Sequence, residues 1–143
     1  MDNVWIIYAL LSAFGAALVA IFGKIGLQGI DTNVATAIRA VVMALFLIGI
    51  IFIQGKLVDI KPVLTNHKAL LFIVLSGVAG AVSWLFYFIA LKNAKVSQIV
   101  PIDRLSVVFA LLLAFIILGE KISLQAWIGA VLAVIGGILI ALG

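Results

Sequence analysis

The sequence predicts an all-helical membrane bundle with five transmembrane helices. Apolar residues make up 67% of the 143-residue chain, and the mean hydropathy is +1.46, whereas about half the residues of a soluble domain are apolar. The apolar runs are continuous and lack the alternation of a half-buried strand. Residues 69–91 and 122–143 contain no charge and exceed the roughly 20 residues that cross about 30 Å of hydrocarbon. Because five short segments cannot close a barrel, helices must satisfy the backbone in lipid.

The chain is predicted to form a single membrane domain over residues 1–143. The expected helices lie at about residues 4–27, 33–54, 69–91, 96–118 and 123–142. The connections between them are short, which leaves no room for an extramembrane catalytic or ligand-binding domain. Since five is an odd number, the two termini are expected on opposite sides of the membrane.

The first and fifth helices carry small residues at intervals of four. In the first helix the series is Ala9, Ala13 and Ala17, and in the fifth it is Gly129, Ala133, Gly137 and Ala141. Such a stripe lets helix backbones approach closely, which is how helices associate within lipid. Packing within one subunit and contact between subunits both remain open for the fifth helix.

The second, third and fourth helices carry polar and aromatic residues instead. Helical rise places Arg39 and Asp103 roughly 8–10 Å inside the same membrane face. Trp84 and Tyr87 belong to the same half of the membrane. This predicts one polar patch that lines a solute pathway, composed of Arg39, Ser83, Trp84, Tyr87, Asp103 and Arg104.

Most members of this predicted patch also have a structural explanation. A central charge in a span costs at least about 2.5–3.5 kcal/mol, and Arg39 could reduce that cost by extending toward the interface. Asp103 could form a structural ion pair with Arg39 or Arg104. Trp84 and Tyr87 could belong to an aromatic belt at the interface. These alternatives stay open beside the solute pathway.

Pro101 interrupts the fourth span just before Asp103 and Arg104. Proline removes one amide donor and frees a carbonyl on the preceding turn. A broken turn in a membrane is tolerated where it faces protein or a wet cavity. We therefore predict a hinge at Pro101, although a kink beside a buried ion pair would explain the same residues.

Several function classes are disfavoured by the residues that the chain lacks. It has no cysteine, and His67 is its single histidine, so we predict no metal site and no cofactor. Asp103 is the only acidic residue within a predicted span, without a second group for general acid–base catalysis, so we predict no enzyme. The net charge of +4 comes from lysines in short loops, which favours membrane insertion and lipid contact over nucleic-acid binding.

The loop charges define no strong orientation in the membrane. The side that carries the N-terminus has four lysines, and the opposite side has three, or five basic residues if Arg39 and Arg104 are included. The two sets are Lys56, Lys61, Lys68 and Lys121, and Lys24, Lys92 and Lys95. Such a small bias slightly favours a cytoplasmic N-terminus, and it is compatible with both orientations coexisting.

The order of several short motifs resembles the EamA domain of the drug/metabolite transporter superfamily. They begin with Phe22-Gly23-Lys24 and Ala37-Ile38-Arg39, continue with Ala90-Leu91-Lys92-Asn93-Ala94 and Pro101, and end with Leu118-Gly119-Glu120-Lys121-Ile122, Gln125, Gly129 and Gly136-Gly137. The resemblance covers nearly the whole chain. The segment Val100-Pro101-Ile102-Asp103-Arg104-Leu105-Ser106 is similar to that of the small five-helix branch of this superfamily.

This resemblance implies one repeat of a ten-helix transporter fold that is built from two inverted five-helix repeats. It implies a half-size transporter that exports or exchanges small solutes. We expect alternating access between two inverted units, and we assign Asp103 to charge balance or proton coupling. The expected partners are the lipid bilayer, a small solute, and a second five-helix unit in an antiparallel homodimer or a heterodimer. The alternatives are a non-transporting accessory subunit and a flippase for a lipid-linked intermediate. The expected location is the plasma membrane of a prokaryote, as a multi-pass protein.

Overall fold

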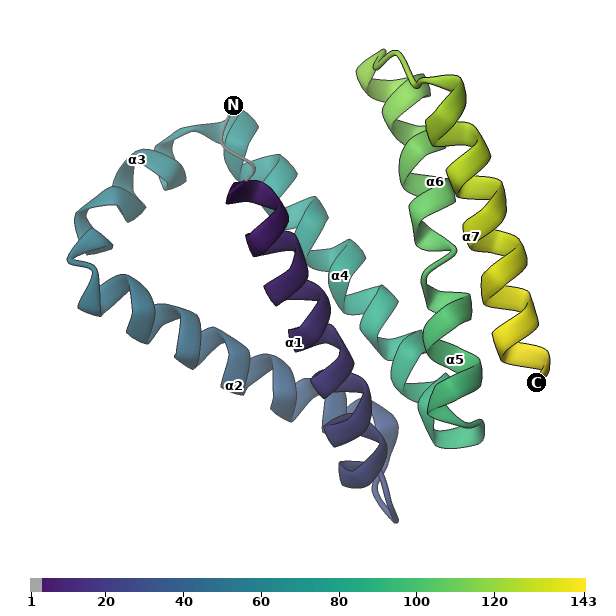
Figure 1. Ribbon diagram of the computed structural model, residues 1–143. Helices are drawn as coiled ribbons and strands as arrows, with labels where there is room; N and C mark the ends of the chain where they lie inside the picture. Colours follow the sequence, from purple (N-terminus) through teal and green to yellow (C-terminus); the bar gives the residue numbers. More distant parts are fainter. Residues whose placement is uncertain (1–3) are drawn as a thin grey trace. The chain divides into compact units, whose positions relative to one another are not determined.

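The computed structural model describes residues 4–143, and its described elements are all helical (Figure 1). In chain order they are α1 (Val4–Gly26), α2 (Thr32–Ile53), the 3₁₀ helix η1 (Lys56–Asp59), α3 (Ile60–Thr65), α4 (His67–Asn93), α5 (Val96–Asp103), α6 (Ser106–Leu113), the π-helical turn η2 (Ala114–Leu118) and α7 (Leu124–Leu142). Within the described residues, five helices or continuous helical runs are long and apolar enough to cross a membrane, with Val96–Leu118 counted as one run. The predicted fold class, an all-helical membrane bundle with five spans, is confirmed.

The chain divides into two compact units, and each is described by itself. Unit 1 runs to Ile25 and resumes over Asn93–Gly143, so it contains nearly all of α1 together with α5, α6, η2 and α7. Unit 2 is Gly26–Lys92 and contains α2, η1, α3 and nearly all of α4.

In unit 2, polar side chains define where the two long helices begin. The Asp31 carboxylate accepts hydrogen bonds from the amides of Asn33 and Val34 at 2.9 and 3.0 Å. The Asn66 side chain accepts one from the amide of Ala69 at 3.1 Å. Both satisfy amide groups that a helix start leaves without a partner. The start of α2 meets the end of α4, and the two helices diverge toward α3 (Figure 1).

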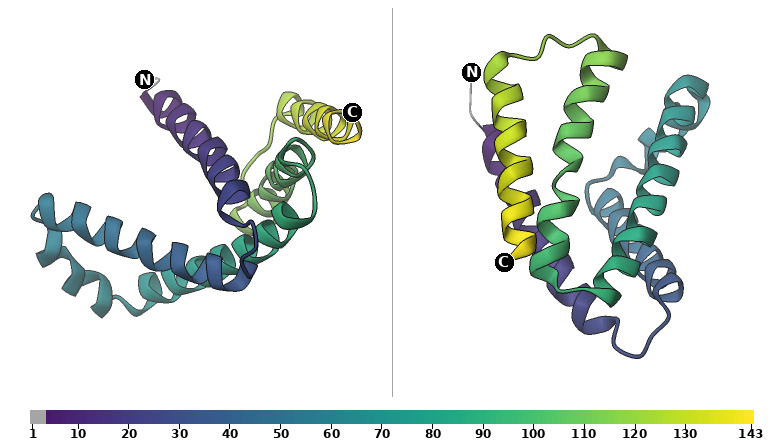
Figure 2. Two further views of the ribbon diagram at one scale, coloured as in Figure 1. Left: turned by 90° about the horizontal axis from the view of Figure 1, so that it is seen from below. Right: turned by 90° about the vertical axis from the view of Figure 1, so that its right-hand side faces the viewer.

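In unit 1, α6 and α7 run side by side in opposite directions, as the right view of Figure 2 shows. The connection between them turns at Gly119, which has a left-handed φ of +67° that glycine adopts without steric cost. Ser123 then caps α7, because its hydroxyl oxygen accepts a hydrogen bond from the amide of Ala126 at 3.2 Å. The closest packing in the unit is between α5 and α7.

The fourth membrane span is broken shortly after Pro101. α5 ends at Asp103, and α6 begins at Ser106 after a two-residue turn. The amide of Leu105 donates to the carbonyl of Ile102 at 2.9 Å, one residue nearer than its α-helical partner, the carbonyl of Pro101. The amide of Val108 likewise bonds the carbonyl of Leu105 at 3.0 Å. The helix is therefore tightened here, and the Pro101 carbonyl is turned away from the usual ladder.

The Pro101 carbonyl lies against α7 at Gly137. A β-carbon placed on Gly137 would be only 3.1 Å from the Pro101 oxygen and 3.6 Å from its carbonyl carbon. Gly137 is buried, whereas Gly129 has open space where a β-carbon would lie. The absence of a side chain at Gly137 therefore permits the close approach of α5 and α7.

Few side chains are buried, and most large apolar side chains point outward. The buried apolar residues are Ala20, Leu27, Phe88, Leu91, Ile99 and Ala130. Outward-facing leucine, isoleucine, valine and phenylalanine side chains occur along every span. In a membrane, hydrocarbon tails cover such surfaces at no hydrophobic cost, so a large apolar core is not required.

Candidate functional site

The candidate site is an aromatic cluster around Arg39 in unit 2. The Arg39 guanidinium carbon lies 3.5 Å from the centroid of the Trp84 ring and 5.5 Å from that of Phe88. Trp84 and Tyr87 meet edge to face with centroids 5.5 Å apart and an interplanar angle of 79°. Phe88 completes the cluster, since its centroid is 5.7 Å from Trp84 and 6.2 Å from Tyr87.

Helical periodicity explains why three aromatic rings meet the same arginine. Tyr87 and Phe88 follow Trp84 on α4 by three and four residues, so all three rings lie near one helix face. Arg39 is seven residues from the start of α2, which corresponds to roughly 10 Å along the helix axis. The cluster therefore lies about two turns inside the end where α2 and α4 meet, within the membrane-spanning parts of both helices.

The cation is stabilised by the rings rather than by water alone. A guanidinium over the face of a tryptophan is attracted by the negative ring face, by about 0.5–2 kcal/mol depending on desolvation. This attraction offsets part of the cost of a charge within a span. Arg39 is half-buried, so one side of its planar guanidinium contacts the rings and its N–H groups can still reach a ligand. Flat, multidentate donors of this kind suit carboxylate and phosphate groups.

The Thr36 hydroxyl, one turn before Arg39 on α2, is already hydrogen-bonded. Thr32 and Thr36 are 8% and 7% exposed, and the Thr36 hydroxyl donates to the Thr32 carbonyl at 2.7 Å. A threonine bonded to the carbonyl four residues earlier needs no external partner. Among Thr32, Thr36 and Arg39 near the start of α2, Arg39 is the one whose side chain is best suited to bind an anion.

Two lysines, one in each unit, bond to backbone carbonyls just beyond helix ends. In unit 1 the Lys24 ammonium donates to the carbonyl of Ala94 at 2.8 Å. In unit 2 the Lys92 ammonium donates to the carbonyl of Ile30 at 3.1 Å. Each links two segments that are distant in sequence and satisfies a carbonyl beyond a helix end.

The remaining predicted pathway residues belong mainly to the broken span of unit 1. Pro101 is half-buried, and Asp103 and Arg104 are exposed at the turn between α5 and α6. The irregular backbone and the two charged residues therefore coincide. A pairing of Asp103 with Arg39 would join the two units and stays a prediction, as does the hinge at Pro101.

Of the six predicted pathway residues, the structure brings Arg39, Trp84 and Tyr87 into one cluster. Ser83 is exposed, one residue before Trp84. Phe88 is absent from the predicted patch although it is only 3% exposed and contacts all three cluster members. Its position four residues after Trp84 is the sequence signal that could have identified it.

The small residues predicted to pack helices have different surroundings on α7. Gly137 is buried against Pro101 and Ala141 is half-buried, while Gly129 and Ala133 are exposed. A spacing of four residues advances about 40° beyond a full turn at 3.6 residues per turn. Four members of such a series consequently rotate around the helix, and only part of the stripe faces α5.

The described residues contain no group of three His, Cys, Asp or Glu side chains that could hold a metal ion. The cluster itself combines a cation, apolar ring faces and the Tyr87 hydroxyl. Such a surface can bind an anionic or planar small molecule within a span.

Comparisons with known proteins give consistent results over nearly the full chain. The profile of the EamA-like transporter family matches residues 3–142. A Sinorhizobium protein named "Uncharacterized transporter in cobO 3'region" is 38% identical over 141 residues, which are 99% of each chain. An uncharacterized protein of Methanocaldococcus jannaschii is 30% identical over 97 residues, which are 67% of this chain and 71% of that protein. No solved structure matches the chain.

Proposed function

We propose that this chain, which belongs to the EamA-like transporter family and is a multi-pass membrane transporter, moves small anionic solutes as one half of a dimer. The family match over residues 3–142 confirms the resemblance to the EamA domain that the short sequence motifs indicated. The substrate class, the dimer and the transport mechanism are our proposals, and each has its own support.

The observation that carries the substrate class is the position of Arg39 over Trp84. The ring face holds the guanidinium in place inside a span, and the N–H groups at its edge can bind a carboxylate or phosphate. Tyr87 adds a hydroxyl, and Trp84 and Phe88 add apolar area for the rest of the solute. A positive charge kept within a membrane span is expensive, which favours a role in solute binding.

The proposed assembly is an antiparallel homodimer in the plasma membrane of a prokaryote. Two inverted copies would place their Arg39 clusters in opposite halves of the bilayer and would build an alternating-access pathway between them. The nearly balanced loop charges support this arrangement, because they favour neither orientation strongly. The match to the Sinorhizobium protein over 99% of both chains supports the five-span unit, and the bacterial and archaeal relatives support the prokaryotic location.

Three residues of the broken span complete the proposed mechanism. We assign Pro101 to a hinge, Arg104 to the attraction of anionic solutes, and Asp103 to charge balance or proton coupling. Their position at the turn between α5 and α6 supports these roles, because irregular backbone beside charge is typical of transporter solute sites.

Transport by the purified chain in liposomes tests the role of Arg39. The substrate would be a carboxylate or phosphate metabolite selected by thermal-shift screening. We expect Arg39→Gln to lower uptake about tenfold or more, because a charge-assisted hydrogen bond contributes about 1.5–3 kcal/mol. Lys121→Gln removes the same charge from a loop and serves as the control. Normal uptake by the Arg39 variant would reject the proposed site.

The orientation of the C-terminus tests the assembly. Reporters that are active on only one side of the membrane would be fused to the C-terminus, and we expect signal from both sides. A single uniform orientation would contradict the antiparallel homodimer. Failure of the purified chain to transport any solute that it binds would instead favour a heterodimer or an accessory subunit.

A further inference from the structure

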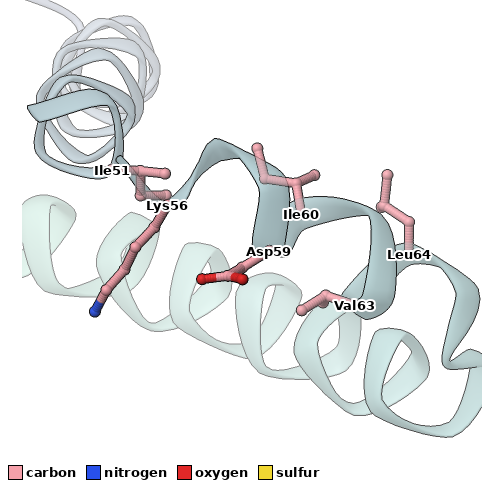
Figure 3. Close-up of a pocket in the computed structure, with 6 residues that line it drawn as sticks. All are labelled: Ile51, Lys56, Asp59, Ile60, Val63 and Leu64. Atoms are coloured by element: carbon pink, nitrogen blue, oxygen red, sulfur yellow. The ribbon is translucent and has the colours of Figure 1, made fainter. Parts of the chain in front are cut away.

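The connection between α2 and α4 forms a groove that the transport proposal does not use. It is open, has a volume of about 330 Å³, and combines an apolar wall with one cation and one anion (Figure 3). Its lining residues are Ile51, Lys56, Asp59, Ile60, Val63 and Leu64.

The side chains of the two charged residues point to the same side of the segment. Lys56 and Asp59 are the first and last residues of the 3₁₀ helix η1, and side chains three residues apart eclipse each other in a 3₁₀ helix. Figure 3 shows both side chains on the same side of the segment, with the Lys56 ammonium and the Asp59 carboxylate apart from each other. The groove therefore presents a separated positive and negative charge rather than a closed ion pair.

The groove lies where lipid headgroups meet hydrocarbon. α2 ends at Ile53 and α4 begins at His67, and both helices are long and apolar enough to span the bilayer. The short connection between two adjacent spans must run along the membrane surface. The polar groups of the groove therefore lie at headgroup depth, and its apolar wall can reach the upper part of the acyl chains.

We propose that this groove binds a phospholipid whose headgroup carries both a phosphate and a primary ammonium group, as in phosphatidylethanolamine. The Lys56 ammonium donates to the phosphate, and the Asp59 carboxylate accepts hydrogen bonds from the lipid ammonium. One acyl chain lies along Ile60, Val63 and Leu64, whose side chains are 42%, 41% and 55% exposed. The charge pattern of the groove is complementary to that of the headgroup.

Other common headgroups match this charge pattern less well. A trimethylammonium headgroup has no N–H to donate to Asp59, so beside the phosphate contact it keeps only a weaker Coulombic attraction to the carboxylate. A headgroup with net negative charge binds Lys56 but is opposed by the Asp59 carboxylate. Lys61 in the same connection and Lys68 in the first turn of α4 attract phosphates in general, yet neither lines the groove.

Native mass spectrometry of the purified full chain in detergent tests the proposal. The probes are phosphatidylethanolamine, phosphatidylcholine and phosphatidylglycerol with identical acyl chains. We expect the ethanolamine lipid to bind about two- to fivefold more tightly than the choline lipid, the range for an exposed ion pair. Asp59→Asn should remove this preference. Lys56→Gln should weaken the binding of both lipids by a similar factor.

Two further variants separate the groove from the surface around it. Lys61→Gln removes the same charge from the same connection outside the groove, and we expect unchanged lipid affinities. Val63→Trp should fill the groove and weaken the binding of all three lipids, while the elution volume in size-exclusion chromatography stays unchanged.

Equal binding of the ethanolamine and choline lipids, tighter binding of the glycerol lipid, or equal effects of Lys61→Gln and Lys56→Gln would each overturn the proposal. If Val63→Trp dissociates a dimer and leaves lipid binding unchanged, the occupant of the groove is a second copy of the chain. That result would also overturn the proposal.

Discussion

The contact between α2 and α4 and the contact between α5 and α7 bring helices together by opposite means. In unit 2 long side chains meet, with the Arg39 guanidinium over Trp84 and two further rings around it. In unit 1 the backbone of α5 at Pro101 approaches α7 at Gly137, where no side chain intervenes. The first contact depends on electronic complementarity between a cation and rings, and the second on the absence of a β-carbon.

This difference has a common cause in the solvent. Burial of apolar surface does not draw helices together in lipid, because the lipid tails are as apolar as leucine side chains. Helices can then associate through polar or cation–ring attraction, or through close van der Waals contact of small residues. The attraction leaves a chemically active cation in unit 2, whereas in unit 1 the close contact leaves two helix backbones packed directly against each other. The former suits solute binding and the latter suits support of the broken span.

The strongest test of the comparison is Gly137→Leu. The new β-carbon would lie 3.1 Å from the Pro101 oxygen, and overpacking of this kind costs about 1–3 kcal/mol. We expect a corresponding loss in the free energy of unfolding, measured in detergent. Gly129→Leu is the matched control on the same helix, because nothing lies within 4 Å of its β-carbon position. Equal losses in the two variants would show that the close approach at Gly137 does not matter.

An intermediate effect is expected from Trp84→Leu. This substitution removes the cation–ring contact of Arg39 and two ring pairs, and we expect a loss of about 1–2 kcal/mol. Thermal unfolding in detergent provides the measurement. Trp5→Leu is the control, since Trp5 is 67% exposed on α1. A similar shift in both variants would mean that the aromatic cluster adds nothing beyond ordinary apolar contact.

The smallest effect on stability is expected from Asp103→Asn. Asp103 is exposed at the end of α5, and exposed substitutions usually change stability by within about 0.5 kcal/mol. If Asp103 balances charge or carries a proton during transport, liposome uptake should fall several-fold while thermal unfolding stays unchanged. Undiminished uptake would reject a functional role for this residue.

Part of the candidate site could be predicted from residue spacing. Arg39, Trp84 and Tyr87 were placed in the same half of the membrane because helical rise converts sequence position into depth. The structure adds that Arg39 contacts the Trp84 ring and that Phe88 closes the cluster. Depth alone could not show this, because the rotation of α2 about its axis decides which residues face α4.

The small-residue stripe of α7 shows the opposite limitation. The spacing of Gly129, Ala133, Gly137 and Ala141 identified a helix able to pack closely. It did not identify Gly137 as the member in contact, nor Pro101 as its partner. A stripe with a period of four residues rotates around the helix, and the partner backbone selects one point along it.

The amino-acid sequence by itself determined the membrane environment, the five spans and the family of this protein. These follow from the length and hydropathy of each segment, since lipid imposes the same requirement on every backbone group wherever it lies. Only the tertiary structure decided that Arg39 stacks on Trp84, that the Pro101 carbonyl meets Gly137, and that Lys56 and Asp59 share one groove. Those contacts depend on how each helix is rotated about its axis and how closely it approaches its neighbour. Hydropathy is the same for many such arrangements, so weak and specific interactions select one of them.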